Sequence, residues 1–134
     1  MKVVLDTNVF VSGVFFNGPP FQILQAWRAG RTQLVISAEI LDEYRRVGEI
    51  LAEEYPAINL VPMLEFVEQN AIVLSVPPLA ERICDDPDDD KFLACALTGG
   101  SKLIISGDKH LLKVSGNQNI EVMKPRDFLD KYLR

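Results

Sequence analysis

The sequence is poor in the residues on which several common kinds of site depend. Its 134 residues include two cysteines, Cys84 and Cys95, and a single histidine, His110. A zinc site needs more soft ligands than these three residues supply. A Ser/His/Asp triad would have to rest on one histidine in a turn, and neither a Walker loop nor a Gly-x-Gly-x-x-Gly motif is present. Zinc, triad and dinucleotide chemistry are therefore not expected.

Long hydrophobic runs are also missing. No apolar stretch approaches the roughly 20 residues that a membrane-spanning helix needs. The chain reaches Asp6 too early for a secretory signal peptide. With no sign of secretion, two reduced thiols are expected. These absences favour a cytoplasmic protein with no membrane partner.

Size and charge leave the class of partner open. A chain of 134 residues, of which 48% are hydrophobic and 25% charged, predicts one globular domain over residues 1–134. The net charge of −5 counts against nucleic acid. However, residues 1–101 carry a balance of −8 and residues 102–134 a balance of +3. Bound cations can neutralise carboxylates and allow phosphate binding. The net charge therefore leaves nucleic acid open as a partner, and the question depends on individual residues.

Short apolar runs alternate with helical segments along the chain. Strands are expected at residues 2–5, 33–36, 71–76, 102–105 and 120–123. Helices are expected at residues 21–29, 37–54, 60–70, 88–98, 109–113 and 125–133. Strands that are apolar on both faces and separated by helices predict an α/β fold with a parallel sheet between helical layers. In such sheets the site lies at the carboxyl ends of the strands.

Two aspartates directly follow predicted strands. Asp6 comes after the first strand, and Asp108 follows the strand at 102–105 through Ser106 and Gly107. Each aspartate is equally well explained as a cap of the helical turn that follows it. Two strands that deliver an aspartate to the same edge nevertheless favour a shared site.

Glu43 is the most diagnostic acid. Within the helix that Ser37 is expected to cap, an apolar arc is formed by Ile40, Leu41, Tyr44, Val47, Ile50 and Leu51. Glu43 falls inside the edge of this arc, where a carboxylate would lose hydration unless it is paired or bound to a metal. The alternative is a glutamate whose head reaches solvent from the edge of the arc.

The stretch 85–90 contains five aspartates in six residues. Acids at a helix start cap free amides and interact well with the helix dipole, and Asp88 is the expected cap. Asp89 and Asp90 lie on the apolar side of the helix, and spacing does not choose between them. Lys91 is expected to point away.

Carboxylates that converge from separate segments suit a hard divalent cation. Mg²⁺ and Mn²⁺ prefer oxygen ligands and complete an octahedron with water. Such ions activate water and stabilise the leaving oxygen of a phosphodiester. Metal-assisted hydrolysis is the chemistry that these residues favour.

Four motifs of the chain resemble, in order and spacing, the motifs of PIN-domain nucleases. Within that family the chain is similar to the toxins of bacterial toxin–antitoxin pairs. The motifs are Val4–Val9, Ser37–Tyr44, Asp88–Ala94 and Ile105–Asp108. The resemblance implies a three-layer Rossmann-like fold and an Mg²⁺- or Mn²⁺-dependent centre that cleaves RNA. It also implies a homodimer and an antitoxin protein as partner.

Carried over by position, the resemblance implies four metal-binding, catalytic acids: Asp6, Glu43, Asp90 and Asp108. Asp90 is preferred over Asp89 because the family's acid precedes an apolar pair and an alanine. Asp89, Ser106 and Asn8 would support these acids without being primary ligands.

Other functions fit less well. A phosphatase with an aspartate nucleophile would need a second acid where the chain has Asn8, and a receiver domain would need an acid where Pro77 and Pro78 follow a strand. The serious alternative is a non-catalytic PIN scaffold that binds RNA or a protein. Cations that would meet an RNA backbone are Arg45, Arg46, Lys109, His110 and Lys113.

Overall fold

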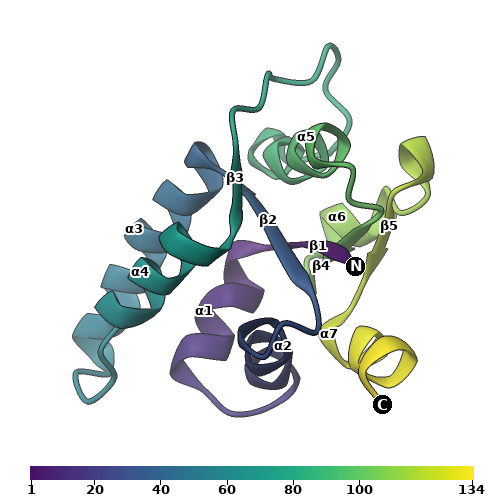
Figure 1. Cartoon of the computed structure of the whole chain (residues 1–134). Helices are drawn as coiled ribbons and strands as arrows, with labels where there is room; N and C mark the ends of the chain where they lie inside the picture. Colours follow the sequence, from purple (N-terminus) through teal and green to yellow (C-terminus); the bar gives the residue numbers. More distant parts are fainter.

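A computed structural model describes residues 1–134. Five parallel strands form one sheet in the order β3-β2-β1-β4-β5. The strands are β1 (Lys2–Leu5), β2 (Gln33–Ser37), β3 (Ile72–Leu74), β4 (Leu103–Ile105) and β5 (Glu121–Met123). Figure 1 shows α5 on one side of the sheet and α1 and α2 on the other. This arrangement is the α/β fold with helices on both faces that the sequence predicts.

Seven α-helices connect or follow the strands. They are α1 (Thr7–Phe15), α2 (Pro19–Arg28), α3 (Ala38–Glu54), α4 (Val61–Asn70), α5 (Asp90–Gly99), α6 (Lys109–Lys113) and α7 (Pro125–Phe128). Short turns of other helix types complete the chain: η1 (Pro87–Asp89), η2 (Asn117–Asn119) and η3 (Leu129–Leu133). All the predicted strands and helices are present, with shifted ends. None of the helices is long and apolar enough to cross a membrane.

The order of the strands creates a switch point beside β1. From β1 the chain adds β2 and β3 on one side, whereas β4 and β5 lie on the other side. Ligand crevices in open parallel sheets form at the carboxyl ends of the strands where the direction of winding reverses. Leu5 and Ile105 are paired at these ends. Asp6 and Ser106, which follow these two residues, therefore lie where a ligand site is expected.

Helix α1 is the element that the sequence does not predict. Its buried residues lie on nearly all of its sides, so the helical period of apolar residues is hidden. They are Thr7, Val9, Phe10, Val11, Gly13 and Phe15. Gly13 allows α1 to approach α2, since a Cβ there would lie 2.6 Å from Leu24 Cδ1 and 2.8 Å from the Pro20 carbonyl oxygen. The close packing at Gly13 holds α1 against α2, while the Asp6 side chain caps the start of α1.

Helix α3 begins as predicted, because the Ser37 hydroxyl accepts a hydrogen bond from the Ile40 amide at 3.1 Å. Tyr44 is fully buried, stacks on Phe10 at 4.2 Å between ring centres, and donates its hydroxyl proton to the Leu5 carbonyl at 2.5 Å. Ile50, expected on the buried arc, is 60% exposed. The first half of α3 is therefore held against β1 and α1, which places Glu43 near the sheet edge.

Candidate active site

Asp6, Ser106 and Asp108 form a connected group at the switch point. Asp6 is buried, and its Oδ2 accepts a hydrogen bond from the fully buried Ser106 hydroxyl at 2.5 Å. The same hydroxyl oxygen accepts the Asp108 amide at 2.9 Å. One side chain directly after β4 thus links the two aspartates that follow β1 and β4. Ser106 thereby holds one oxygen of Asp6 in place.

Both aspartates also cap helices. Asp6 Oδ1 accepts the Asn8 amide at 3.1 Å, and Asp108 Oδ1 accepts the His110 amide at 2.7 Å. The capping interpretation is therefore correct for both residues. It does not compete with a shared site, because a carboxylate has two oxygens and about four acceptor positions. Asn8 takes part through its backbone, and its side chain is exposed.

Glu43 lies at the same edge but has cationic and hydroxyl partners. Its Oε1 is 2.9 Å from Lys91 Nζ and 3.9 Å from an Arg46 guanidinium nitrogen, and its Oε2 accepts a hydrogen bond from the Thr7 hydroxyl. The Lys91 and Glu43 side chains are only 10% and 19% exposed. The expectation that Lys91 points away is wrong, because the pairing brings the Lys91 head back over α5 to Glu43. Sequence periodicity gives the direction of a Cβ but not the path of a long flexible side chain.

Asp89 and Asp90, which spacing alone could not separate, have different surroundings. Asp90 accepts the Cys84 amide at 2.7 Å and the Ile83 amide at 3.2 Å. Asp89 is 8% exposed, and its Oδ2 is buried without a hydrogen-bond partner. The Asp90 carboxylate is thus bound by amides of the preceding loop, whereas one oxygen of Asp89 has no hydrogen-bond donor.

The cap of this segment is also different from the prediction. Asp86, rather than Asp88, receives the hydrogen bond at the helix start, because its Oδ1 accepts the Asp88 amide at 3.0 Å. The chain first makes the turn η1 and enters α5 only at Asp90. Pro87 stands at the first position of that turn, where its fixed backbone angle fits. The predicted cap is two residues late because η1 is too short to show a periodic pattern.

Burial and neighbouring carboxylates raise the pKa of two of the acids, Asp6 and Asp89. Burial raises the pKa of Asp6, and the charges of Asp108 and Glu43 add to this, while the bonds from Ser106 and the Asn8 amide lower it. Burial raises the pKa of Asp89 to about 6, with further contributions from Asp108, Asp86 and Asp6, while His110 lowers it. Asp6, Asp89 and Asp108 therefore share one electrostatic environment. A cation placed among them would stabilise their charged forms.

The donor set fits a hard divalent ion with a large share of water ligands. No three acidic, histidine or cysteine side chains surround one point closely enough to hold a metal ion unaided. Mg²⁺ commonly keeps several waters and takes only one or two carboxylates together with substrate phosphates. The unpartnered Oδ2 of Asp89 and the buried carboxylate of Asp6 are oxygen donors of this kind. One or two of Asp6, Asp89 and Asp108 could thus bind such an ion, with water and a substrate phosphate completing its ligands.

The two cysteines take no part in this chemistry. Burial raises the pKa of both thiols to about 12, and for Cys84 the nearby Asp90 adds to the effect. Neither cysteine forms a disulfide. A thiol that stays protonated is a poor nucleophile and a poor metal ligand, so both residues serve the core.

Several cations named from the sequence are engaged elsewhere. Arg45 is paired with Glu68 at 2.6 Å, and Lys113 with Asp85 at 2.9 Å. His110 Nδ1 is 4.0 Å from Asp85. Lys91, which the sequence did not suggest, is the cation that pairs with Glu43 at 2.9 Å. Its position directly after the acidic stretch is the only signal in the sequence that could have indicated it.

Comparisons with known proteins agree with the fold. Residues 2–110 match the family model described as a PIN domain. The chain therefore belongs to the PIN-domain family, whose members are generally nucleases. An uncharacterized protein of Methanocaldococcus jannaschii is 27% identical over 143 aligned residues, which cover 98% of this chain and 92% of that protein. No solved structure gives a significant match.

Proposed function

We propose that the chain is a metal-dependent endoribonuclease that hydrolyses RNA phosphodiester bonds with Mg²⁺ or Mn²⁺ at the carboxyl edge of the sheet. One observation carries the proposal: the charges of Asp6, Asp89 and Asp108 act on one another at the switch point, and no lysine or arginine forms an ion pair with any of the three. Such a group is costly in a folded protein unless it binds a cation. Membership of a nuclease family makes a phosphodiester the natural substrate.

The residues around the acids have distinct proposed roles. Asp6 and Asp108 would bind the ion, Ser106 would keep the Asp6 carboxylate aligned, and Asp89 would add an oxygen from α5. When bound, a divalent cation supplies Lewis acidity that activates water and stabilises the leaving oxygen. Glu43 would complete the set of acids once its partner Lys91 is drawn to an RNA phosphate.

Asp90 remains a predicted ligand from the motif resemblance, but its contacts favour a different task. By accepting the amides of Ile83 and Cys84, it fixes the loop that precedes α5. In this proposal Asp90 orders the border of the site and Asp89 meets the ion. If Asp90 binds the ion, substitution of Asp90 should abolish activity. If Asp89 binds the ion, substitution of Asp89 should do so.

The decisive experiment is cleavage of a mixed single-stranded RNA pool by the purified protein. Reactions contain Mn²⁺, Mg²⁺ or chelator, and each is repeated with Asp108→Asn, which keeps the shape of the side chain. We expect products that require metal and vanish in the variant. Unchanged products with chelator, or in the variant, would refute the proposal.

A second measurement separates a weak nuclease from a binding scaffold. Calorimetric titration with Mn²⁺ should show that Glu43→Gln weakens ion binding, whereas Glu49→Gln, on the exposed face of the same helix, does not. If neither variant alters ion binding and no RNA is cut, the chain is better described as a non-catalytic PIN scaffold.

The motif resemblance extends the proposal to a cytoplasmic, dimeric toxin with a cognate antitoxin. The four motifs carry this part of the proposal. Induced expression of the wild type, but not of Asp108→Asn, should arrest bacterial growth. Growth at the same rate with both proteins would remove the toxin role and leave the nuclease proposal intact.

A further inference from the structure

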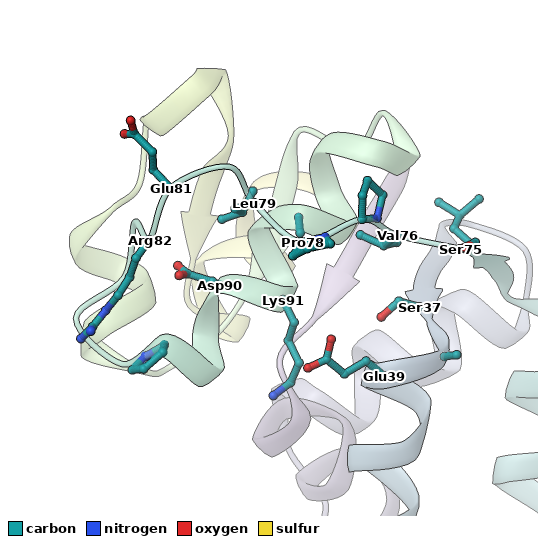
Figure 2. A pocket seen from close by; sticks show the side chains of 15 residues that line it. Ser37, Glu39, Ser75, Val76, Pro78, Leu79, Glu81, Arg82, Asp90 and Lys91 are labelled. Carbon is teal, nitrogen blue, oxygen red and sulfur yellow. The ribbon is translucent and has the colours of Figure 1, made fainter.

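A groove of 560 Å³ lies beside the acids at the carboxyl ends of β2 and β3. In Figure 2, Ser37 and Glu39 from the start of α3 face it from one side, Pro78 and Leu79 from the loop after β3 from another, and Lys91 borders it from α5. This volume is within the range of about 300–1,000 Å³ that small-molecule sites occupy. The groove is therefore large enough for a nucleotide and opens next to the proposed reaction centre.

The lining of the groove has the chemistry of a site for a flat, partly polar ring. Leu74, Pro77, Pro78 and Leu79 supply apolar surface, which suits the face of a nucleobase. The groove is also lined by polar side chains. The Ser37 hydroxyl oxygen already accepts the Ile40 amide, so its proton is available to a ligand. Lys91 provides a second donor close to the acids.

Glu39 is the polar group that selects among bases. It is exposed at the groove, and its carboxylate makes no hydrogen bond or ion pair within the protein. Guanine alone carries two adjacent donors, N1–H and the N2 amino group, on its Watson–Crick edge, beside the O6 acceptor. A carboxylate pairs with both donors at once, while O6 faces a donor such as Ser37 or Lys91. Uracil and adenine would instead turn ring acceptors toward the carboxylate.

We propose that this groove binds an unpaired guanine of the RNA next to the bond that is cut, with Glu39 accepting from its Watson–Crick edge. The inference rests on the proposed nuclease function for its place in the reaction. Single-stranded RNA is generally read through such splayed bases. The loop that forms the other wall is fixed in advance, because Asp90 binds the Ile83 and Cys84 amides.

Binding can be tested without metal and without cleavage. Amide signals of ¹⁵N-labelled protein are followed during titration with 5′-GMP, 5′-AMP, 5′-CMP and 5′-UMP, with chelator present. We expect GMP to bind most tightly and to shift the amides of Ala38, Ser75 and Leu79. Equal binding of all four nucleotides, or shifts confined to the surroundings of Asp6 and Asp108, would overturn the proposal.

Two variants and one control localise the effect. Glu39→Gln should reduce the preference for GMP about tenfold, which is the size of one well-paired base contact. Ala38→Leu should block the groove and abolish the shifts while the circular dichroism spectrum stays unchanged. Glu49→Gln, on the exposed side of α3, should behave like the wild type. A Glu39→Gln protein with an unchanged preference would refute the role of Glu39.

Cleavage then separates this inference from the function on which it rests. RNA oligonucleotides with a single guanine in an otherwise uniform sequence are compared with oligonucleotides that lack it. Cuts that ignore the guanine would refute the groove assignment and leave the nuclease standing. Binding of GMP by a protein that cuts no RNA would support the groove and refute the nuclease.

Discussion

The carboxylates at the carboxyl edge of the sheet stand in two different electrostatic settings. On the side of β1 and β4, Asp6 and Asp108 accept hydrogen bonds from hydroxyl and amide donors, and Asp89 has a buried oxygen without a partner. None of the three forms an ion pair with a lysine or arginine, although His110 lowers the pKa of Asp89. On the side of α3, Glu43 is paired with Lys91 at 2.9 Å. Raised pKa values for Asp6 and Asp89 accompany the first setting.

The comparison suggests an order of events at the site. A divalent ion should bind more favourably beside β1 and β4, because there it relieves the repulsion among carboxylates that have no paired lysine or arginine. The side with Lys91 is already neutral and would change only when a stronger partner arrives. The four acids inferred from motifs thus differ in whether a cation of the protein is already paired with them. Substitutions at the two groups should therefore change metal binding by different amounts.

The largest expected effect separates Asp89 from Asp90. Asp89→Asn should weaken Mn²⁺ binding and cleavage about a hundredfold, the upper end of the range for groups that support a metal site. Asp90→Asn should reduce cleavage less than about tenfold and lower the free energy of unfolding by about 1 kcal/mol, because it weakens the acceptor of two amides. Calorimetry and chemical denaturation measure both. The reverse order of the two activities would restore Asp90 as the ligand.

A smaller effect is expected from Ser106→Ala. The variant removes the donor to Asp6 Oδ2 and the acceptor of the Asp108 amide. Metal affinity should fall about tenfold, as is usual when a group that orients a ligand is lost. The control is Ser115→Ala, whose hydroxyl accepts the Val122 amide away from the acids. Equal losses in the two variants would indicate general destabilisation.

Lys91→Met tests the neutral side of the edge. Without metal, the protein should lose about 1 kcal/mol of stability, because a largely shielded ion pair is broken and Glu43 keeps only weaker partners. Metal affinity should rise about threefold, the size of a typical ion pair, because Glu43 can then face the ion instead of Lys91. Thermal unfolding with and without Mn²⁺ measures both changes. A fall in metal affinity would mean that Lys91 helps to build the metal site.

The smallest effect concerns pH in the absence of metal. Because the pKa of Asp89 is about 6 in the folded protein against an ordinary value of 3.8, the folded state holds this proton more tightly than the unfolded state. Its contribution to stability is therefore present below pH 3.8 and is lost as the pH rises through about 6. Asp89→Asn should remove this slope and add about 1 kcal/mol at pH 7, because water at the open edge screens the charges. Denaturant titrations at pH 5 and pH 7 test the difference, and an unchanged slope would contradict it.

The sequence predicts the sheet and most helices because their apolar patterns are clear. Helix α1 is missed since its buried residues lie on most of its sides. The convergence of Asp6 and Asp108 is predictable from two strands that end at one edge. The partition between Asp89 and Asp90 is not, because it depends on the turn η1 and on a loop whose amides choose one carboxylate. The Lys91–Glu43 pair depends on side-chain rotamers, which no periodic pattern encodes.

The pairing of β1 with β4 has a consequence for the protein during its own synthesis. Val3 to Leu5 lie beside Leu103 to Ile105, so the middle of the sheet joins segments about a hundred residues apart. A chain that grows from its N-terminus carries Asp6 and Glu43 long before it has Asp108. A nascent chain that has not yet made β4 therefore lacks the group of acids at the sheet edge. The strand order itself delays the assembly of this group until the segment that follows β4 has been made.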